Sequence, residues 1–393
     1  MDNITHSLVG VALADLSWGR AARSQRPLLV GAAIVAANLP DIDLAYSGIT
    51  PSPLGYLLHH RGHTHTIAGL GGLAIALVLA YGFFPSVRRM RISEQLRFWL
   101  LIAIALASHL ALDALNTYGV HPFYPFDNDW YYGDTVFILE PFFWVTLGIA
   151  VAASAGTRMA RLLAGLPLVV LLFTLAATRA APPESVAVLV VVGGAFAWLA
   201  VRVSPRTRAA VALALCGLIV AGLAATSRAA RGATLEALRP AVTGQVVDVI
   251  LTPNPSSPLC WSAIAIEARE TDATYVLWSG TLSLLPAWRS PTACALHGFF
   301  GSRDVRVLGE GRFALSGEIH QPLGRLRALA RGNCRVRAWL RFGRAPVIDG
   351  EWIYDLRFRE RTTDNFSRMR LNGRDGCPGF VPEWPMPRAD LLQ

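Results

Sequence analysis

The sequence predicts an α-helical integral membrane bundle of about eight spanning helices, followed by a small β-rich soluble domain. Hydrophobic residues make up 53% of the 393 residues and charged residues only 16%, and long apolar runs recur up to about residue 226. After residue 240, apolar and polar residues alternate in short segments separated by proline and glycine, which is typical of strands. The chain has no lysine, and its arginines gather in short loops, which favours a membrane protein over a protein that binds nucleic acid.

The apolar runs predict the membrane helices in order, over 4–19, 28–45, 65–84, 97–115, 136–154, 159–178, 185–203 and 208–226. The first helix is short and carries His6 and Asp15, so a re-entrant first helix would leave seven crossings. A basic stretch over 227–240 follows, as a linker or an amphipathic helix. The predicted domains are therefore a membrane domain over 1–226, this stretch, and a β-rich domain over 241–393.

Arginine placement predicts the orientation of the helices. Arginines occupy the loops after the first, third, fifth and seventh helices, within 20–26, 88–97, 158–161 and 202–208. Because loops rich in arginine stay in the cytoplasm, the N-terminus, the other loops and the C-terminal domain should lie outside it. Four of the five cysteines fall in that domain, and an even number in an oxidising compartment predicts two disulfides with the pairing left open, among Cys260, Cys294, Cys334 and Cys377.

Alternating segments predict the strands of the C-terminal domain. They cover 244–251, 262–270, 274–280, 334–343 and 351–360. The single cysteine outside this domain, Cys216, lies in an apolar helix, where we expect plain packing.

Histidines and acids gather in the most hydrophobic part of the chain. Seven of the nine histidines precede residue 122, and the predicted orientation places nearly all of these polar groups at the outer ends of their helices. Ionisable side chains are costly in lipid, so there they normally mark a functional site. Because imidazoles mixed with carboxylates are the usual ligands of zinc and related ions, the sequence predicts a metal site at the membrane surface.

Spacing supports this site without settling every role. His109 and Asp113 share a helix face, either as two ligands, as one ligand with its supporting carboxylate, or as a pair that fastens two helices. Asp41 and Asp43 follow Pro40 at a helix end, where one could bind metal while the other bonds a ligand or caps a helix.

The segment HHRGHTHT at 59–66 is the densest cluster. It holds His59, His60, His63 and His65, and Gly62 allows a close backbone approach or a positive φ. Arg61 beside a metal predicts an anionic substrate, and the alternative is an ordinary salt bridge to Asp41 or Asp43.

Other residues carry weaker signals. His6, Asp134 and Glu140 would each be an ordinary cap or loop residue if found alone. Beside the stronger motifs, His6 becomes a candidate ligand, whereas Asp134 and Glu140 join Asp43 as candidate general bases. The aromatic run at 121–134 is typical of a membrane interface and could also wall a pocket. His121, His297 and His320 receive no role.

Four motifs together resemble a known family. They are TH-x-L-x-G at 5–10, PDID at 40–43, HRG-x-TH at 60–65 and SH-x-x-x-D at 108–113. Residues 1–145 thereby resemble the bacterial inner-membrane metal-dependent hydrolases of the YdjM (LexA-binding) type, and 133–144 is similar to a longer branch with a C-terminal soluble domain. The matching positions are His6, Asp41, Asp43, His60, Arg61, Gly62, His65, His109 and Asp113; His63 stands at a variable position and Thr66 replaces the more usual serine. A looser similarity to zinc-dependent phospholipases C is an analogy of fold only.

The residues and the resemblance together predict a membrane-bound hydrolase. One or two divalent ions, zinc first and Mn²⁺ or Mg²⁺ as alternatives, would bind among His6, Asp41, Asp43, His60, His65, His109 and Asp113 and lower the pKa of bound water toward ~7. Arg61, Asp43, Asp134 and Glu140 are the candidate catalytic residues, and the expected substrate is a lipid or lipid-linked anionic ester such as a phosphoester. The alternative is a metal-binding transporter or sensor without hydrolysis, although the later helices have almost no charge for a polar path.

Overall fold

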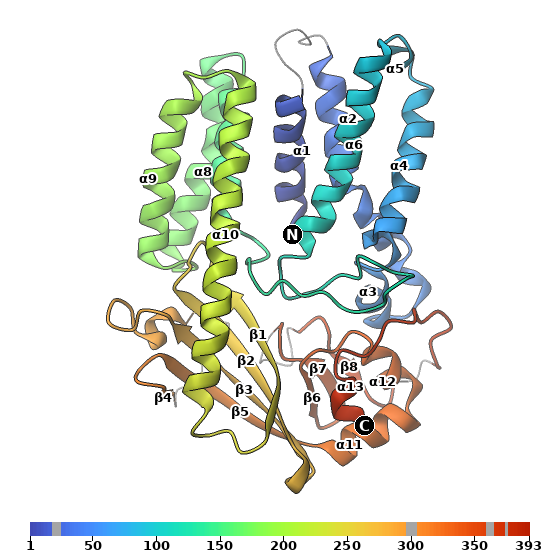
Figure 1. The fold of residues 1–393 in the computed structure, drawn as a ribbon, viewed down its shortest axis with the longest axis vertical. Helices are drawn as coiled ribbons and strands as arrows, with labels where there is room; N and C mark the ends of the chain where they lie inside the picture. Colours follow the sequence, from blue (N-terminus) through green and yellow to red (C-terminus); the bar gives the residue numbers. More distant parts are fainter. Residues whose placement is uncertain (18–24, 296–304, 359–364, 374–375) are drawn as a thin grey trace.

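The computed structural model describes residues 1–17, 25–295, 305–358, 365–373 and 376–393. Long helices stand side by side above a mixed C-terminal domain, and both chain ends lie on the side of the helices where that domain begins (Figure 1). Arg20 and Arg23 of the first predicted cytoplasmic loop, and His297, lie outside the described residues.

Every predicted membrane segment contains a helix. These are α1 (Asn3–Ser17), α2 (Arg26–Asn38), α4 (Ile67–Gly82), α6 (Ile92–Asp113), α7 (Pro141–Ala153), α8 (Arg158–Ala177), α9 (Pro183–Ala200) and α10 (Pro205–Leu238). Shorter pieces join them: η2 (Leu39–Ala45), η3 (Ser47–Ile49), α3 (Leu54–His59), η4 (His63–His65) and α5 (Pro85–Arg88).

Fewer helices are long enough to cross a membrane than the sequence predicts. Within the described part of the chain, five helices are long and apolar enough to cross a membrane, or six if the bent pair around His65 is one span. Helices α1 and α7 have only 15 and 13 residues. Eight crossings are therefore not confirmed.

Two predicted helix ends are wrong. The second helix stops at Asn38 and not at 45, and the PDID motif lies on the 3₁₀ helix η2. Pro40 has no N–H to continue the α-helical hydrogen bonds, which accounts for the change of helix type. The last helix does not stop at 226 but continues to Leu238, so that most of the basic stretch 227–240 is the end of α10, which packs against the sheet (Figure 1).

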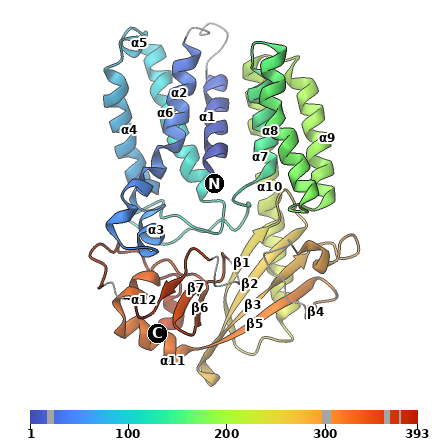
Figure 2. The same ribbon diagram turned by 180° about the vertical axis from the view of Figure 1, so that it is seen from behind.

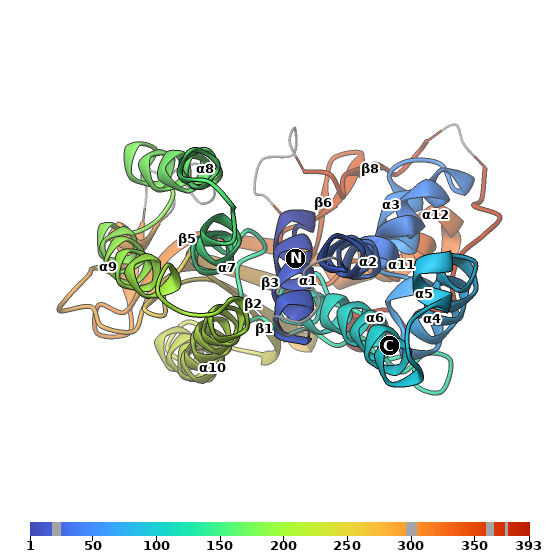
Figure 3. The same ribbon diagram turned by 90° about the horizontal axis from the view of Figure 1, so that it is seen from above.

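Small residues let the helices approach closely. A Cβ at Gly10 of α1 would lie 2.9 Å from the carbonyl oxygen of Ala33 on α2, and α2 buries four alanines, Ala32, Ala33, Ala36 and Ala37. Such close contacts are the usual packing in membranes, where apolar burial against lipid gives no advantage. From above, α1, α2, α4 and α6 form one group and α7 to α10 another, and α1 contacts both groups (Figure 3).

The C-terminal domain has two antiparallel sheets and short helices. The larger sheet has the order β1-β2-β3-β5-β4, built from β1 (Gln245–Pro253), β2 (Cys260–Arg269), β3 (Thr274–Ser283), β4 (Arg306–Leu308) and β5 (Phe313–Pro322). The smaller sheet contains β6 (Pro346–Asp349), β7 (Trp352–Asp355) and β8 (Met369–Arg370). The remaining elements are α11 (Leu323–Gly332), α12 (Cys334–Trp339), α13 (Ala389–Leu392) and the 3₁₀ helices η5 (Glu270–Asp272) and η6 (Pro291–Cys294).

The disulfide prediction is confirmed, and one predicted strand is wrong. Cys260 pairs with Cys294, and Cys334 pairs with Cys377. The segment 334–343 begins with helix α12 because Asn333 caps it, accepting from the backbone N–H groups of Arg335 and Val336. Its buried residues Val336, Trp339 and Leu340 follow the three-to-four spacing of a helix face.

Candidate metal centre

The candidate ligands converge at the end of the bundle that faces the C-terminal domain. His6 lies on α1, Asp41 and Asp43 on η2, His65 ends η4, and His109 and Asp113 occupy the last turns of α6. The chain passes under the bundle through η2 and α3. The motifs at 40–43 and 60–65 therefore lie beside the lower end of α6 (Figures 1 and 2). Residues from four separate parts of the chain thus meet at one place.

Four of these residues form a compact group. The Nε2 atom of His65 lies 3.0 Å from Nε2 of His109, 3.4 Å from Asp41 Oδ1 and 3.3 Å from Asp113 Oδ2. Nε2 of His109 lies 3.4 Å from the same Asp41 oxygen and 3.6 Å from the same Asp113 oxygen. Ligands of a tetrahedral zinc ion with bonds of about 2.0–2.1 Å would be about 3.3–3.4 Å apart. The four atoms therefore have the spacing of a tetrahedral metal site.

Hydrogen bonds behind the two imidazoles hold them in orientation. Nδ1 of His109 donates to the backbone oxygen of Ala37 at 2.7 Å. Nδ1 of His65 lies 3.1 Å from Asp43 Oδ2, which also accepts from the Thr64 hydroxyl at 2.8 Å. With a hydrogen on each Nδ1, both Nε2 atoms turn lone pairs toward the centre of the group. A carboxylate or carbonyl behind a ligating histidine is the usual support of a metal site.

His6 completes one wall of the group. Its ring stacks on the ring of His109, with centroids 3.8 Å apart, and its Nε2 lies 3.4 Å from Asp113 Oδ1. The side chain is fully buried, and neither ring nitrogen has a hydrogen-bond partner among the described residues. Burying an imidazole without a hydrogen-bond partner is costly, so the unpartnered ring nitrogens of His6 fit a cation at the centre of the group. The backbone amino group of Met1 also contacts Asp113 Oδ1.

A second group shares Asp41 with the first. Asp41, Asp43 and His60 also present ligand atoms within 4.8 Å of one another. His60 Nδ1 lies 3.1 Å from Asp43 Oδ1 and 4.0 Å from Asp41 Oδ1. The buried Asp43 carboxylate thus faces two imidazoles, one Thr64 hydroxyl and one backbone N–H, that of Arg61. Those contacts are typical of a carboxylate that orients metal ligands, and less typical of a free general base.

Arg61 lies differently from what the sequence predicts. Its guanidinium is 3% exposed, its Nε lies 2.9 Å from Asp113 Oδ2, and its Nη1 donates to Asn116 Oδ1 at 2.9 Å. Its side chain therefore faces Asp113, and neither the side chain of Asp41 nor that of Asp43 is its partner. The positive φ expected at Gly62 belongs instead to Arg61, at +58°, whereas Gly62 has φ −84°. Gly62 instead allows the backbone to pass close to the His59 carbonyl oxygen, because a Cβ there would lie 2.8 Å from that oxygen.

Asp134 and Glu140 do not join the group, contrary to their interpretation as general bases. Asp134 forms a two-bonded ion pair with Arg344, with both distances 2.8 Å. Glu140 accepts from the backbone N–H of Phe142 at 3.1 Å and contacts the Ser256 hydroxyl. Burial raises the pKa of the Glu140 carboxyl. Both acids instead attach the membrane domain to the C-terminal domain.

The other four histidines among the described residues lie apart from the two groups. His59 bonds the Thr50 hydroxyl at 2.8 Å, the exposed His63 packs 5.0 Å from Trp384, and His121 stacks on Trp384 at 4.1 Å. His320 is a surface residue paired with Glu318.

The C-terminal domain contributes contacts that sequence reasoning missed. Arg357 donates to the backbone oxygen of Thr117 at 2.7 Å, and Trp384 donates to that of Leu58 at 3.1 Å. Tyr118 packs 4.7 Å from the Arg61 guanidinium. The motif NTYG at 116–119 was interpreted only as a helix end, and nothing in the sequence links it to residues 240 positions later. Both loops that carry ligands are thus held from below.

Comparison with known proteins shows a similarity to one family. The model of the YdjM inner membrane protein family matches residues 1–182. A curated relative, the uncharacterized protein YfhP of Bacillus subtilis (strain 168), is 28% identical over 157 residues, which are 39% of this chain and 46% of the relative. The match therefore spans less than half of that relative, and no solved structure matches the chain. The family match confirms that this chain resembles the YdjM inner membrane proteins over residues 1–182, which carry all the candidate ligands.

Proposed function

We propose that the chain is a membrane-bound metal-dependent hydrolase that acts at the membrane surface on a lipid-linked or anionic ester, with a phosphoester as the first choice. The observation that carries the proposal is the pair of imidazole nitrogens 3.0 Å apart, His65 Nε2 and His109 Nε2. With each Nδ1 hydrogen on its neighbouring acceptor, the two Nε2 lone pairs face each other, and a shared metal ion would relieve that repulsion, as would a proton on one of the rings.

The charges and the donor types support a divalent ion. The carboxylates of Asp41, Asp43 and Asp113 together with the guanidinium of Arg61 leave a net charge of −2 around neutral histidines, or −1 when the Met1 amino group beside Asp113 is protonated. Two nitrogen and two oxygen donors suit zinc, and the oxygen-rich second group leaves Mn²⁺ or Mg²⁺ as alternatives. We propose Asp41, His65, His109 and Asp113 as ligands of one ion, with His6 beside them and His60 with Asp43 as the place for a second.

Such an ion would supply hydroxide near neutral pH and polarise the ester oxygen under attack. The chain's own residues would do the rest. Asp43 and the Ala37 carbonyl keep the two imidazoles in the right tautomer, and Arg61 offsets the buried charge of Asp113. Asp41 and His60 have 9% and 11% exposed side chains while the other members are almost fully covered, so substrate and water would enter past them.

Apolar side chains surround this opening. Ile42 stands between the two aspartates and is 49% exposed, and Tyr56, 39% exposed, stacks on His60 at 4.9 Å. Ile49 and Phe366 are also exposed, and Phe366 packs edge-on against Tyr56. An apolar rim beside a charged centre suits a substrate with a hydrocarbon tail and an anionic head.

We also propose that the metal centre and the C-terminal domain face the outside of the inner membrane. Two disulfides suit an oxidising compartment, and the arginine-rich loops 88–97, 158–161 and 202–208 lie at the opposite end of the bundle (Figure 1). Reporter fusions after residues 90 and 393 test this. Activity of a periplasm-specific reporter at 393 and not at 90 is expected, and the reverse would overturn the orientation.

The deciding experiment measures metal and turnover on the same detergent-purified protein. Elemental analysis should find at least one divalent ion per chain, and a panel of lipid phosphoesters and carboxyl esters should reveal hydrolysis. His109→Ala should abolish both, and His63→Ala, outside the group, should abolish neither. Bound metal without hydrolysis of any ester would favour the metal-binding transporter or sensor, whereas protein without metal would leave only His–Asp pairs that fasten helices.

A further inference from the structure

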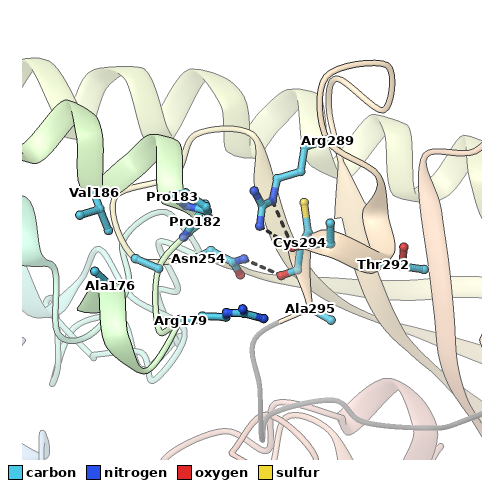
Figure 4. Close-up of a pocket in the computed structure, with 12 residues that line it drawn as sticks. Ala176, Arg179, Pro182, Pro183, Val186, Asn254, Arg289, Thr292, Cys294 and Ala295 are labelled. Atoms are coloured by element: carbon cyan, nitrogen blue, oxygen red, sulfur yellow. Dashed lines mark hydrogen bonds between the residues drawn. The ribbon is translucent and has the colours of Figure 1, made fainter. Parts of the chain in front are cut away.

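A second cavity lies between the two domains, away from the metal centre. It has a volume of about 530 Å³ and is formed on one side by the turn between α8 and α9 and on the other by η6 of the C-terminal domain (Figure 4). Arg179, Arg289 and Asn254 are its main polar residues, and Ala176 and Val186 are among its apolar ones. No residue of the metal group lines it.

The polar lining combines donors for an anion with one unsatisfied acceptor. Arg289 is fixed by Glu184 at 2.9 Å and by the Ala293 backbone oxygen at 2.7 Å. The exposed guanidinium of Arg179 forms no ion pair with any residue that the structure describes. Asn254 is 1% exposed, donates its Nδ2 to the Cys294 oxygen at 2.6 Å, and leaves Oδ1 without a partner among the described residues. The site therefore has a net charge of +1 and still requires one hydrogen-bond donor.

The cavity lies where lipid headgroups would be. Helix α8 ends at Ala177 and α9 begins at Pro183, and both carry apolar side chains that face outward, such as Val170 and Phe173 on α8. Arginines at the ends of membrane helices extend toward the polar interface. The N-terminal N–H groups of α9 add partial positive charge on the same side.

A separate, mostly apolar groove lies next to the cavity along the same helices, and Arg161 is its charged lining residue. It has a volume of about 390 Å³ and runs between α7, α8 and α9, with Leu172, Leu189 and Gly165 in its lining. Leu172 and Leu189 lie one turn from Ala176 and Val186 of the cavity. Along α8 the groove's lining runs from Leu172 to Arg161, a rise of about 16 Å, which is roughly half the ~30 Å hydrocarbon thickness of a bilayer. The groove thus has the length of one acyl chain.

We propose that this cavity and groove bind one anionic phospholipid whose headgroup carries a hydroxyl, of the phosphatidylglycerol type. Arg179 and Arg289 contact the phosphate, Asn254 Oδ1 accepts from the headgroup hydroxyl, and one acyl chain follows the groove past Gly165. A single negative charge matches the net charge of the site, and the zwitterionic headgroup of phosphatidylethanolamine does not. The bound lipid would tie the β sheet to α8 and α9 independently of the hydrolase proposed above.

Native mass spectrometry of delipidated full-length protein tests the proposal, with dioleoyl phosphatidylglycerol, dioleoyl phosphatidylethanolamine, glycerophosphoglycerol and inorganic phosphate as probes. Phosphatidylglycerol should bind most tightly. Arg179→Ala should weaken it about fivefold, the effect of one arginine near a lipid phosphate. Arg239→Ala, which removes another exposed arginine, should change nothing.

A second variant separates lipid from free phosphate. A Cβ at Gly165 meets nothing within 4 Å, so Gly165→Leu should fold and fill the groove, weakening the lipid but not glycerophosphoglycerol. Gly71→Leu on α4, equally open, is its control. Equal affinity of wild type and Arg179→Ala for phosphatidylglycerol would overturn the site. Tight binding of inorganic phosphate, with no effect of Gly165→Leu on lipid, would overturn the lipid as its ligand.

Discussion

His65 and His109 are 44 positions apart, yet their Nε2 atoms face each other at 3.0 Å. The other nitrogen, Nδ1, of each imidazole faces an acceptor, which is the Asp43 carboxylate for His65 and the Ala37 carbonyl for His109. A metal ion between the two Nε2 atoms would use both lone pairs, whereas without it one ring must carry an extra hydrogen to bond the other. The geometry of these two imidazoles therefore supports metal binding more directly than the number of histidines and acids in the sequence.

Removal of either imidazole should strip the metal. His65→Ala and His109→Ala each delete a direct ligand, so elemental analysis should find less than a tenth of the wild-type metal content. His63→Ala and His320→Ala remove histidines outside the group and should leave the content unchanged. Full metal retention by His109→Ala would contradict the ligand assignment.

Asp43 should affect metal affinity without being indispensable. Asp43→Asn keeps the shape but weakens acceptance from the imidazoles, and loss of such supporting partners costs ~10–100-fold in metal affinity. Competition with a chelator of known affinity measures this loss. Asp349→Asn, at an exposed strand end, is the control. A complete loss of metal would instead make Asp43 a direct ligand in its own right.

Arg61→Ala should destabilise the protein. It removes the guanidinium from the buried Asp113 carboxylate and leaves only the Met1 amino group beside it, and breaking a buried pair costs about 3–5 kcal/mol. The thermal midpoint should fall, and Arg61→Lys should restore part of it, because lysine keeps the charge but loses the bond to Asn116. An Arg61→Ala protein with a normal midpoint and no turnover would instead place Arg61 on the substrate, as the sequence interpretation had it.

Arg344 should hold the two domains together. It pairs with Asp134 of the membrane domain and with Asp248 of β1 at 2.8 Å, and it lies 4.0 Å above the Tyr132 ring. Arg344→Ala should cost about 3–5 kcal/mol and make the chain between the domains more sensitive to protease. Arg370→Ala removes the exposed pair with Glu351, worth about 0–1 kcal/mol, and should have little effect.

The C-terminal domain should lose stability in acid through Glu267. Burial would raise the pKa of this carboxyl, but the Arg269 guanidinium, the Gly244 and Thr243 N–H groups and the Trp278 indole lower it to about 2, below its ordinary value of 4.5. The stabilisation is therefore present above pH 4.5 and is lost as the pH falls toward 2. Melting curves of wild type and Glu267→Gln should differ most near neutrality and converge in acid. A constant difference from pH 7 to 2 would rule this role out.

The sequence by itself determined the two-part architecture and most of the candidate centre. Runs of apolar residues locate helices because each must fill its own span, and period-two segments such as 262–270 locate strands for the same local reason. His109 and Asp113 share a face whenever 108–113 is helical, so that pair could be predicted without a fold. The cysteines predicted two disulfides but not their pairing, since pairing depends on which strands meet.

Only the tertiary structure decided what the polar side chains face. Arg61 could have pointed to substrate, to Asp41 or to Asp43; with its backbone at φ +58°, its side chain faces Asp113. Asp134 and Glu140 are attached to Arg344 and Ser256, more than a hundred residues away. Segment 334–343 alternates like a strand but forms a helix because Asn333 caps it and Trp339 needs burial. Such choices depend on contacts between distant segments, which no local pattern encodes.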